Sequence, residues 1–423
     1  MGLRNILSTR EGGAACGGRT ALLTLLSALS LACNQIDAQP RELAIEAPNP
    51  ERLERAEAGE AKSQLAVGQF YRRLAETGMA GSPAAITNHR EAKQWLSKAA
   101  EQNEPEAQLE LGLLLVNADG TAQDLKAGRR WLTQAGQSGQ ANAYFTLGEL
   151  AHQGVDASPN PAQAVSYWVR AADKEHPGAL YRLGEAHENG RGVEADVEAA
   201  LGFYRQAADL KDAQALYRLG AVYDEGMLAL QDAERAVEFY RLASERDHAA
   251  AQARLGLMYA RGEGVIQRYD RAFKWSRAAA EQGDADGCNN LAVLYLKGLG
   301  VEQSFDDAIR WYRTAAEKNH PGAQNMLGTI YLTGQGVDVD LDEAEKWWRS
   351  AADQGYAAAQ YNLGGMFARD LSATLSEEEA LDWLARAADQ GHRSAARELA
   401  EMHATATGMP GSSADGEALD AAI

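Results

Sequence analysis

Four histidines are the first residues that could do chemistry, because an imidazole can bind a metal ion or transfer a proton. They recur at an even spacing of 72 residues: His176, His248, His320 and His392. If that spacing covers two stacked helical hairpins of about 10 Å each, successive histidines stand on the order of 20 Å apart. No single ion can bridge that distance. Asp212 and Asp284 stand midway in the series, so the pattern predicts a role at turns or helix starts and no metal site.

Pairs of glycines could form a second kind of site, a loop that cradles phosphate. In "YLTGQGV" the pair is Gly334 and Gly336. Three similar pairs stand elsewhere in the chain: Gly190/Gly192, Gly262/Gly264 and Gly298/Gly300. A phosphate loop follows a strand and opens a helix, whereas each of these pairs follows a helical pattern. We therefore predict tight turns, in which glycine suits a positive φ, and no cofactor.

Motifs for catalysis are missing from the sequence. There is no H-E-x-x-H, C-x-x-C, nucleophile elbow or S-x-x-K motif. The chain has three cysteines, Cys16, Cys33 and Cys288, which form neither a disulfide framework nor a metal-ligand pattern. We expect Cys288 to be a buried, inert thiol. The sequence thus predicts a protein that is not an enzyme.

The residues above are placed by a repeat of 36 residues. When the chain is aligned on this repeat, one position is Gly in seven units and Ala in two, and Leu precedes it in every unit. We call this position the glycine column: Gly112, Gly148, Gly184, Gly220, Gly256, Ala292, Gly328, Gly364 and Ala400. An aromatic column follows 19 residues later: Trp131, Tyr167, Phe203, Phe239, Trp275, Trp311, Trp347 and Trp383. Gly68 and Trp95 form one earlier unit with an eight-residue insertion. Such self-similarity is the mark of stacked units.

Each unit has the pattern of two helices. In the first helix, the Leu-Gly pair shares a stripe with an aromatic residue three positions on, and a glycine inside a helix costs about 1 kcal/mol relative to alanine. Its recurrence indicates that a neighbouring helix passes close by. The second helix is preceded by a column in which every residue but Arg268 can accept a hydrogen bond from a helix start: Asn88, Asp124, Asn160, Asp196, Asp232, Arg268, Ser304, Asp340 and Ser376. We predict an all-α fold, a solenoid superhelix of about nine 36-residue αα-hairpins over residues 51–403, in which the aromatic column fills the gap between successive hairpins.

The combined pattern A-x-x-x-L-G-x-x-Y-x-x-G-x-G-V, then a capped helix with A-x-x-W-Y-x-x-A-A-x-x-G, resembles Sel1-like repeats, which are related to tetratricopeptide repeats. "AQNMLGTIYLTGQGVDVDLDEAEKWWRSAADQG", residues 323–355, matches nearly throughout. The resemblance implies a superhelical scaffold for protein–protein interaction, often in bacterial signalling, envelope assembly or secretion. Cysteine-rich relatives have been linked to β-lactam binding. This chain lacks their cysteines, so a hydrolase of that type is the disfavoured alternative.

The resemblance also implies that residues two positions before the glycine column line a concave groove. This column reads Glu110, Thr146, Arg182, Arg218, Arg254, Asn290, Met326, Asn362 and Glu398. An apolar strip stands beside it, three residues later: Ala221, Leu257, Val293 and Thr329. We hypothesise that the three arginines grip an acidic peptide or a terminal carboxylate in bidentate hydrogen bonds, and that Asn290, Leu257, Val293, Met326 and Asn362 make further contacts. The alternative is that the arginines pair with acidic neighbours within the chain.

Charge and the chain termini limit the partners and the location. The net charge of −19 makes nucleic acid a poor partner. Residues 1–32 resemble a signal peptide, with three arginines before the apolar run "ALLTLLSALSLAC". That run ends at Cys33 in an imperfect lipobox. Lipidation of Cys33 would make a periplasmic, membrane-anchored lipoprotein; ordinary cleavage, for instance after Ala38, is the alternative.

The remaining segments carry no repeat. Residues 33–50 are expected to form a flexible tether, and residues 404–423 a disordered tail. The predicted function is that of a non-enzymatic scaffold or adaptor in the bacterial cell envelope, which needs no cofactor and touches the membrane only through a lipid anchor. A structural assembly factor of an envelope export complex is the other candidate.

Overall fold

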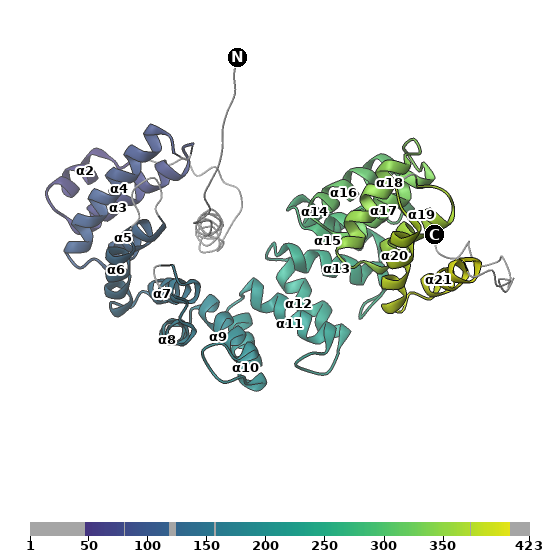
Figure 1. Ribbon diagram of the computed structural model, residues 1–423. Helices are drawn as coiled ribbons and strands as arrows, with labels where there is room; N and C mark the ends of the chain where they lie inside the picture. Colours follow the sequence, from purple (N-terminus) through teal and green to yellow (C-terminus); the bar gives the residue numbers. More distant parts are fainter. Residues whose placement is uncertain (1–46, 80, 118–123, 156–157, 373, 407–423) are drawn as a thin grey trace, which may run out of the picture. The chain divides into compact units, whose positions relative to one another are not determined.

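A computed structural model describes residues 47–79, 81–117, 124–155, 158–372 and 374–406 (Figure 1). Its regular elements over these ranges are α-helices, and none of the described helices is long and apolar enough to cross a membrane. The predicted signal peptide, Cys33, most of the tether and most of the tail lie outside the described residues. The chain divides into two compact units, Met1–Leu210 and Lys211–Ile423, and each is described by itself.

Both units are built from helical hairpins. The helices of the first unit are α2 (Pro50–Glu57), α3 (Ala61–Glu76), α4 (Pro83–Glu101), α5 (Pro105–Asn117), α6 (Leu125–Gln137), α7 (Ala141–Gln153), α8 (Pro161–Ala172), α9 (Pro177–Asn189) and α10 (Val197–Asp209). Those of the second unit are α11 (Ala213–Glu225), α12 (Ala233–Ser244), α13 (Ala249–Arg261), α14 (Tyr269–Glu281), α15 (Ala285–Lys297), α16 (Phe305–Glu317), α17 (Pro321–Thr333), α18 (Leu341–Asp353), α19 (Ala357–Ala368), α20 (Glu377–Asp389) and α21 (Arg393–Ala406). Within each unit, helices adjacent in the chain pack on one another, so the hairpins stack in chain order as predicted.

The helix starts follow the predicted cap columns. Seven residues of the second-helix column accept a hydrogen bond from the helix backbone: Asp124, Asn160, Asp196, Asp232, Ser304, Asp340 and Ser376. The prediction for Asn88 is wrong. Residue 88 lies inside α4, which starts at Pro83 with Ser82 as its cap. The insertion therefore lengthens this helix, because Ser82 and Pro83 supply an earlier start signal.

The histidine series serves the first helices in the same way. Nδ1 of each histidine accepts the backbone N–H of the residue three positions on, and the four distances lie between 3.0 and 3.2 Å. Asp212 and Asp284 make the equivalent bond through a carboxylate oxygen. Burial lowers the pKa of His176 and of His248 to about 4, so both caps are neutral acceptors at pH 7. The predicted helix-start role is confirmed.

The glycine pairs form the predicted turns. Gly334 ends α17 with a φ of 70°, and Gly336 has a φ of 77°. A Cβ at residue 336 would lie 2.4 Å from Cβ of Phe305 at the start of α16. The second glycine is therefore needed for two reasons, its left-handed backbone and the close approach to the preceding hairpin.

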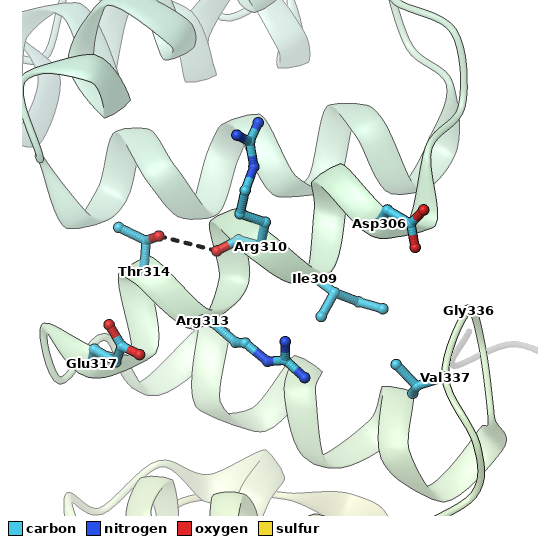
Figure 2. Close-up of a pocket in the computed structure, with 8 residues that line it drawn as sticks. All are labelled: Asp306, Ile309, Arg310, Arg313, Thr314, Glu317, Gly336 and Val337. Carbon is cyan, nitrogen blue, oxygen red and sulfur yellow. Dashed lines mark hydrogen bonds between the residues drawn. The ribbon is translucent and has the colours of Figure 1, made fainter.

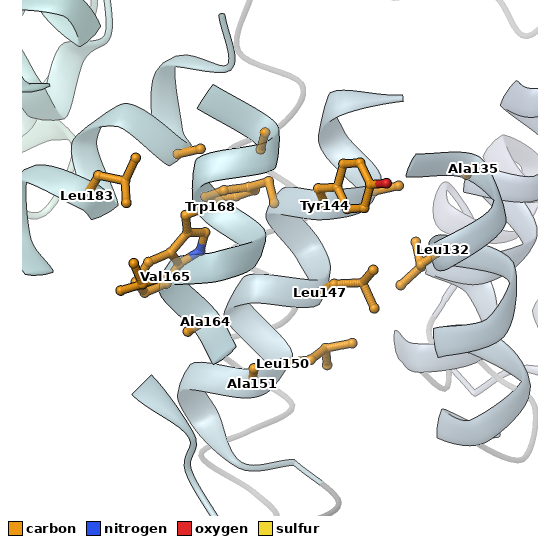
Figure 3. Close-up of a cluster of buried hydrophobic side chains, with 14 of the residues drawn as sticks. Leu132, Ala135, Tyr144, Leu147, Leu150, Ala151, Ala164, Val165, Trp168 and Leu183 are labelled. Carbon is orange, nitrogen blue, oxygen red and sulfur yellow. The ribbon is translucent and has the colours of Figure 1, made fainter. Parts of the chain in front are cut away.

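The glycine column marks a close contact between the two helices of a hairpin. A Cβ at Gly148 would lie 2.4 Å from Cδ1 of Trp168, and one at Gly184 would lie 2.5 Å from Cε1 of Tyr204. These partners come one residue after the predicted aromatic column, which is itself mostly half-buried. Trp347, a member of that column, packs against a cluster spread mainly over α15, α16 and α17. The deep core thus includes the residue next to the column, and Figure 3 shows two such residues, Leu132 on α6 and Trp168 on α8.

A buried polar column ties successive hairpins together. Nε2 of Gln252, Gln324 and Gln360 donates to a carbonyl of the preceding second helix at 3.1–3.2 Å. Cys288 takes the same position in α15, with its Sγ 3.8 Å from the carbonyl oxygen of Ala280. Burial raises the pKa of the Cys288 thiol to about 11. It is the buried thiol that the sequence predicted.

Candidate partner-binding surface

The predicted contact residues lie on the first helices of the hairpins. We call this surface the first-helix face: the side chains three and two positions before the glycine column, and one position after it. Arg182 is on α9 of the first unit. The other seven predicted residues belong to the second unit: Arg218, Arg254, Leu257, Asn290, Val293, Met326 and Asn362. All eight are partly buried, so each unit offers its own part of this face.

Arg182 is held by two carboxylates of the first unit. Its Nε and Nη2 donate to the two oxygens of Glu149 at 3.0 and 2.9 Å, and Nη1 donates to Glu185 at 2.8 Å. The Glu149 side chain is only 4% exposed. Burial alone would lower the pKa of Arg182, but Glu149 and Glu185 raise it above its ordinary value. This is the pairing within the chain that the sequence analysis left open as an alternative.

Arg254 lies in a hollow of the second unit. Its Nη2 is 3.1 Å from Asp224 and 3.4 Å from Glu225, which are the last residues of the α11 carboxyl end. The hollow has a volume of about 220 Å³, and its lining is Asp224, Glu225, Arg254, Leu257, Met258, Arg261 and Glu263. Two predicted contact residues, Arg254 and Leu257, are therefore brought together here. Arg218, on the neighbouring α11, is partly buried.

Asparagines form the next part of the face. Nδ2 of Asn290 donates to the carbonyl of Ala253 at 3.2 Å, and Nδ2 of Asn362 donates to Oδ1 of Asn325 at 2.9 Å. Asn325 and Asn289 are not among the predicted residues. The signal that could have found them is a change of residue type three positions before the glycine column, where Phe145, Tyr181 and Tyr217 give way to Ala253, Asn289 and Asn325.

A second hollow, also missed by the sequence analysis, lies along α16. It has a volume of about 350 Å³, and its lining is Asp306, Ile309, Arg310, Arg313, Thr314, Glu317, Gly336 and Val337. Figure 2 shows Ile309 and Val337 pointing toward one another, while Arg310 and Arg313 extend in different directions. Arg310 is 2.9 Å from Asp307, and Arg313 donates to the Tyr331 hydroxyl at 2.6 Å. This hollow lies mainly on a second helix and is not part of the first-helix face.

The described residues contain no group of three or more His, Cys, Asp or Glu side chains that could hold a metal ion. The first-helix face offers groups suited to non-covalent binding: guanidinium groups, side-chain amides and half-buried apolar groups. Such groups recognise carboxylates, peptide backbone and apolar side chains.

The stacked helical hairpins define the class of this molecule, an α-helical repeat protein. The chain belongs to the Sel1 repeat family: the Sel1 repeat matches residues 61–104, 105–140, 141–176, 177–212, 213–248, 249–284, 285–320, 321–356 and 357–392. The first match has 44 residues against 36 in the others, which confirms the eight-residue insertion. Proteins of this family generally serve as protein-interaction scaffolds and are generally not enzymes.

Solved structures similar to the chain include the following two. One is a protective antigen of uropathogenic Escherichia coli strains that displays an SLR fold, with 29% identity, a TM-score of 0.70, and coverage of 86% of this chain and 76% of that one. The other is a Sel1 repeat protein from Oxalobacter formigenes, with 28% identity, a TM-score of 0.53, and coverage of 89% and 99%. No curated protein matches the chain. The family resemblance and the all-α hairpin fold predicted from the sequence are confirmed.

Proposed function

We propose that this protein is an exported scaffold of the bacterial cell envelope, anchored in the membrane through a lipid on Cys33, which holds a segment of a partner protein on its first-helix face. The family supports the scaffold role. The signal-like residues 1–32 and the sequence "SLAC" support export and anchoring. A single observation carries the binding role: Arg254 and Leu257 line the same hollow, together with the carboxylates of Asp224 and Glu225.

The arginines differ in what they can offer to a partner. Asp224 and Glu225 hold Arg254 in a partly solvated pair, and such pairs contribute about 1 kcal/mol or less. A partner carboxylate could take over this guanidinium at little cost. Arg182 cannot be released so easily, because Glu149 would then be left as a buried, unpaired charge. An acidic contact of the partner therefore belongs at Arg254, with Leu257 as the neighbouring apolar contact.

Site-specific photo-crosslinking in whole cells tests this function. A photoreactive residue replaces Leu257 or Val293 on the first-helix face, and in a matched control it replaces Lys346, which is 62% exposed on the second helix α18. We expect one discrete protein adduct from the first two positions and none from the control. Adducts from position 346 alone, or the same adducts from all three positions, would refute the assignment.

The lipid anchor needs a separate test. Palmitate labelling of the full-length chain should mark the wild type and fail in a Cys33→Ala variant, which should also leave the membrane fraction. A mature amino terminus at Gln39 or nearby, without label, would show ordinary cleavage and would remove the anchor from the proposal.

A further inference from the structure

Three consecutive first helices of the second unit carry an uncharged part of the first-helix face. On α15, α17 and α19 it is formed by nine residues, which we call the amide strip: Asn289, Asn290, Val293, Asn325, Met326, Thr329, Tyr361, Asn362 and Gly365. Charged residues make up 24% of the chain, so about two would be expected among nine positions. None is present, although most of these side chains are partly exposed. A solvated surface of an acidic protein normally carries charge, which indicates that this surface is kept neutral for contact.

Three of the four asparagine amides in the strip are oriented by internal hydrogen bonds but not saturated. The bond from Asn362 to Asn325 uses one amide hydrogen of the first and one lone pair of the second, and the bond from Asn290 to Ala253 uses one hydrogen of Asn290. A side-chain amide has two donor hydrogens and an acceptor with two lone pairs. Each asparagine thus keeps capacity for both donating and accepting, and these two bonds orient the amide planes of Asn290, Asn325 and Asn362.

We infer that the amide strip holds an extended, uncharged segment of the partner by hydrogen bonds between its asparagine amides and the backbone of that segment. A peptide group presents one N–H and one C=O, which is the same pair that a side-chain amide offers. Successive hairpins are about 10 Å apart, and an extended chain rises about 3.3 Å per residue. Each first helix therefore meets about every third residue of the segment, and the strip spans about nine residues.

Charge decides against an acidic segment on this strip. A carboxylate placed over α15, α17 or α19 would lose hydration without a cation among the strip residues to replace it. Arg254 on α13 lies beyond one end of the strip. At the other end Arg369, which follows α19, lies against Gly365, and its Nη2 pairs with Glu398 at 3.8 Å. The inference rests on the proposed function, because it assumes that the first-helix face binds the partner. It adds the chemical class of the segment that is bound.

Peptide selection against the intact mature protein tests the inference. The probe is a displayed library of random peptides of roughly twelve residues, slightly longer than the strip. We expect enriched peptides poor in Asp, Glu, Lys and Arg. Methylation of a single backbone nitrogen should weaken binding about tenfold, and alanine at the same position less than about threefold, because the backbone and not the side chain makes the hydrogen bond.

Variants of the protein then locate the bound peptide. Asn289→Ala and Asn325→Ala should each weaken binding about tenfold, whereas the control Arg313→Gln on α16 should leave it unchanged. Helical circular dichroism and the melting temperature verify folding, and Asn289→Asp gives a nearly isosteric second variant if Asn325→Ala loses stability. Asparagines that serve only to link adjacent helices would change the melting temperature but not the affinity, and that result overturns the inference.

The outcomes separate the inference from the proposed function. Selected peptides that are acidic, and that lose affinity in Arg254→Gln but not in Asn289→Ala, would overturn the neutral-segment inference and leave the binding role of the face intact. Binding that no variant on the first-helix face affects would overturn both. Insensitivity to backbone methylation overturns the inference alone.

Discussion

Two glycines of one hairpin should respond differently to alanine. Gly184 lies inside α9 and Gly202 inside α10. A Cβ at residue 184 would lie 2.5 Å from Cε1 of Tyr204, which is fully buried and donates its hydroxyl to Glu188 at 2.6 Å. A Cβ at residue 202 would meet nothing within 4 Å. The two sites have the same helical backbone and differ in the space around it.

Two opposing effects set the change in the free energy of unfolding. Alanine in place of a helical glycine stabilises by about 1 kcal/mol at both sites. At residue 184 the added methyl also overpacks the core against Tyr204, at a cost of about 1–3 kcal/mol. Because the gain in helix propensity is the same at both sites, the two variants should differ in free energy of unfolding by the cost of overpacking at residue 184. We expect Gly202→Ala to raise the free energy of unfolding by about 1 kcal/mol and Gly184→Ala to lie about 1–3 kcal/mol below it.

Urea denaturation followed by helical circular dichroism measures the difference. The midpoint of Gly202→Ala should lie above that of the wild type, and the midpoint of Gly184→Ala below that of Gly202→Ala. Ala292→Gly is the mirror experiment, since this alanine already fits in the buried cluster that contains Tyr312, and it should destabilise. Equal midpoints for Gly184→Ala and Gly202→Ala would refute the claim that the glycine column marks a close contact between helices.

Three further outcomes follow from buried polar groups. His248 has a pKa of about 4 in the folded protein and about 6.5 in the unfolded chain. Its cap therefore stabilises the fold fully above pH 6.5, and this contribution is lost as the pH falls through 4. His248→Asn should flatten this pH dependence of the urea midpoint. Arg182→Gln should destabilise by about 2–4 kcal/mol, because it leaves buried Glu149 unpaired, and adding Glu149→Gln should restore most of the loss in thermal melts. Cys288, whose pKa burial raises to about 11, should escape alkylation at pH 8 until urea unfolds the chain, as mass spectrometry of the peptides would show.

The period and the helix starts could be predicted because they depend on local chemistry. A cap such as Asp196 bonds to a backbone N–H three residues away, and a turn glycine such as Gly334 needs only its own φ. Each signal is contained in a few consecutive residues and recurs in register. Asn88 failed because Ser82 and Pro83 form an earlier start signal inside the inserted residues.

Other features depend on rotation and register between helices, which no single column reveals. Phe203 and Tyr204 are both aromatic and differ by one step of about 100° around α10, so their types could not tell which one packs on Gly184. The partner of Arg182 is 33 residues away on α7, and its choice requires the stacking of two hairpins. The hollow along α16 likewise depends on how the turn at Gly336 packs against that helix.

Hydroxyl-radical footprinting of the intact protein, with and without the crosslinked partner, tests most directly the claim that the first-helix face is the working surface. The reagent oxidises Met and Trp side chains readily, and the molecule offers such probes on both kinds of helix. The account predicts that Met326 on α17 loses reactivity when the partner binds, while Trp347 on α18 keeps it. Protection of Trp347 with Met326 unchanged would contradict the account.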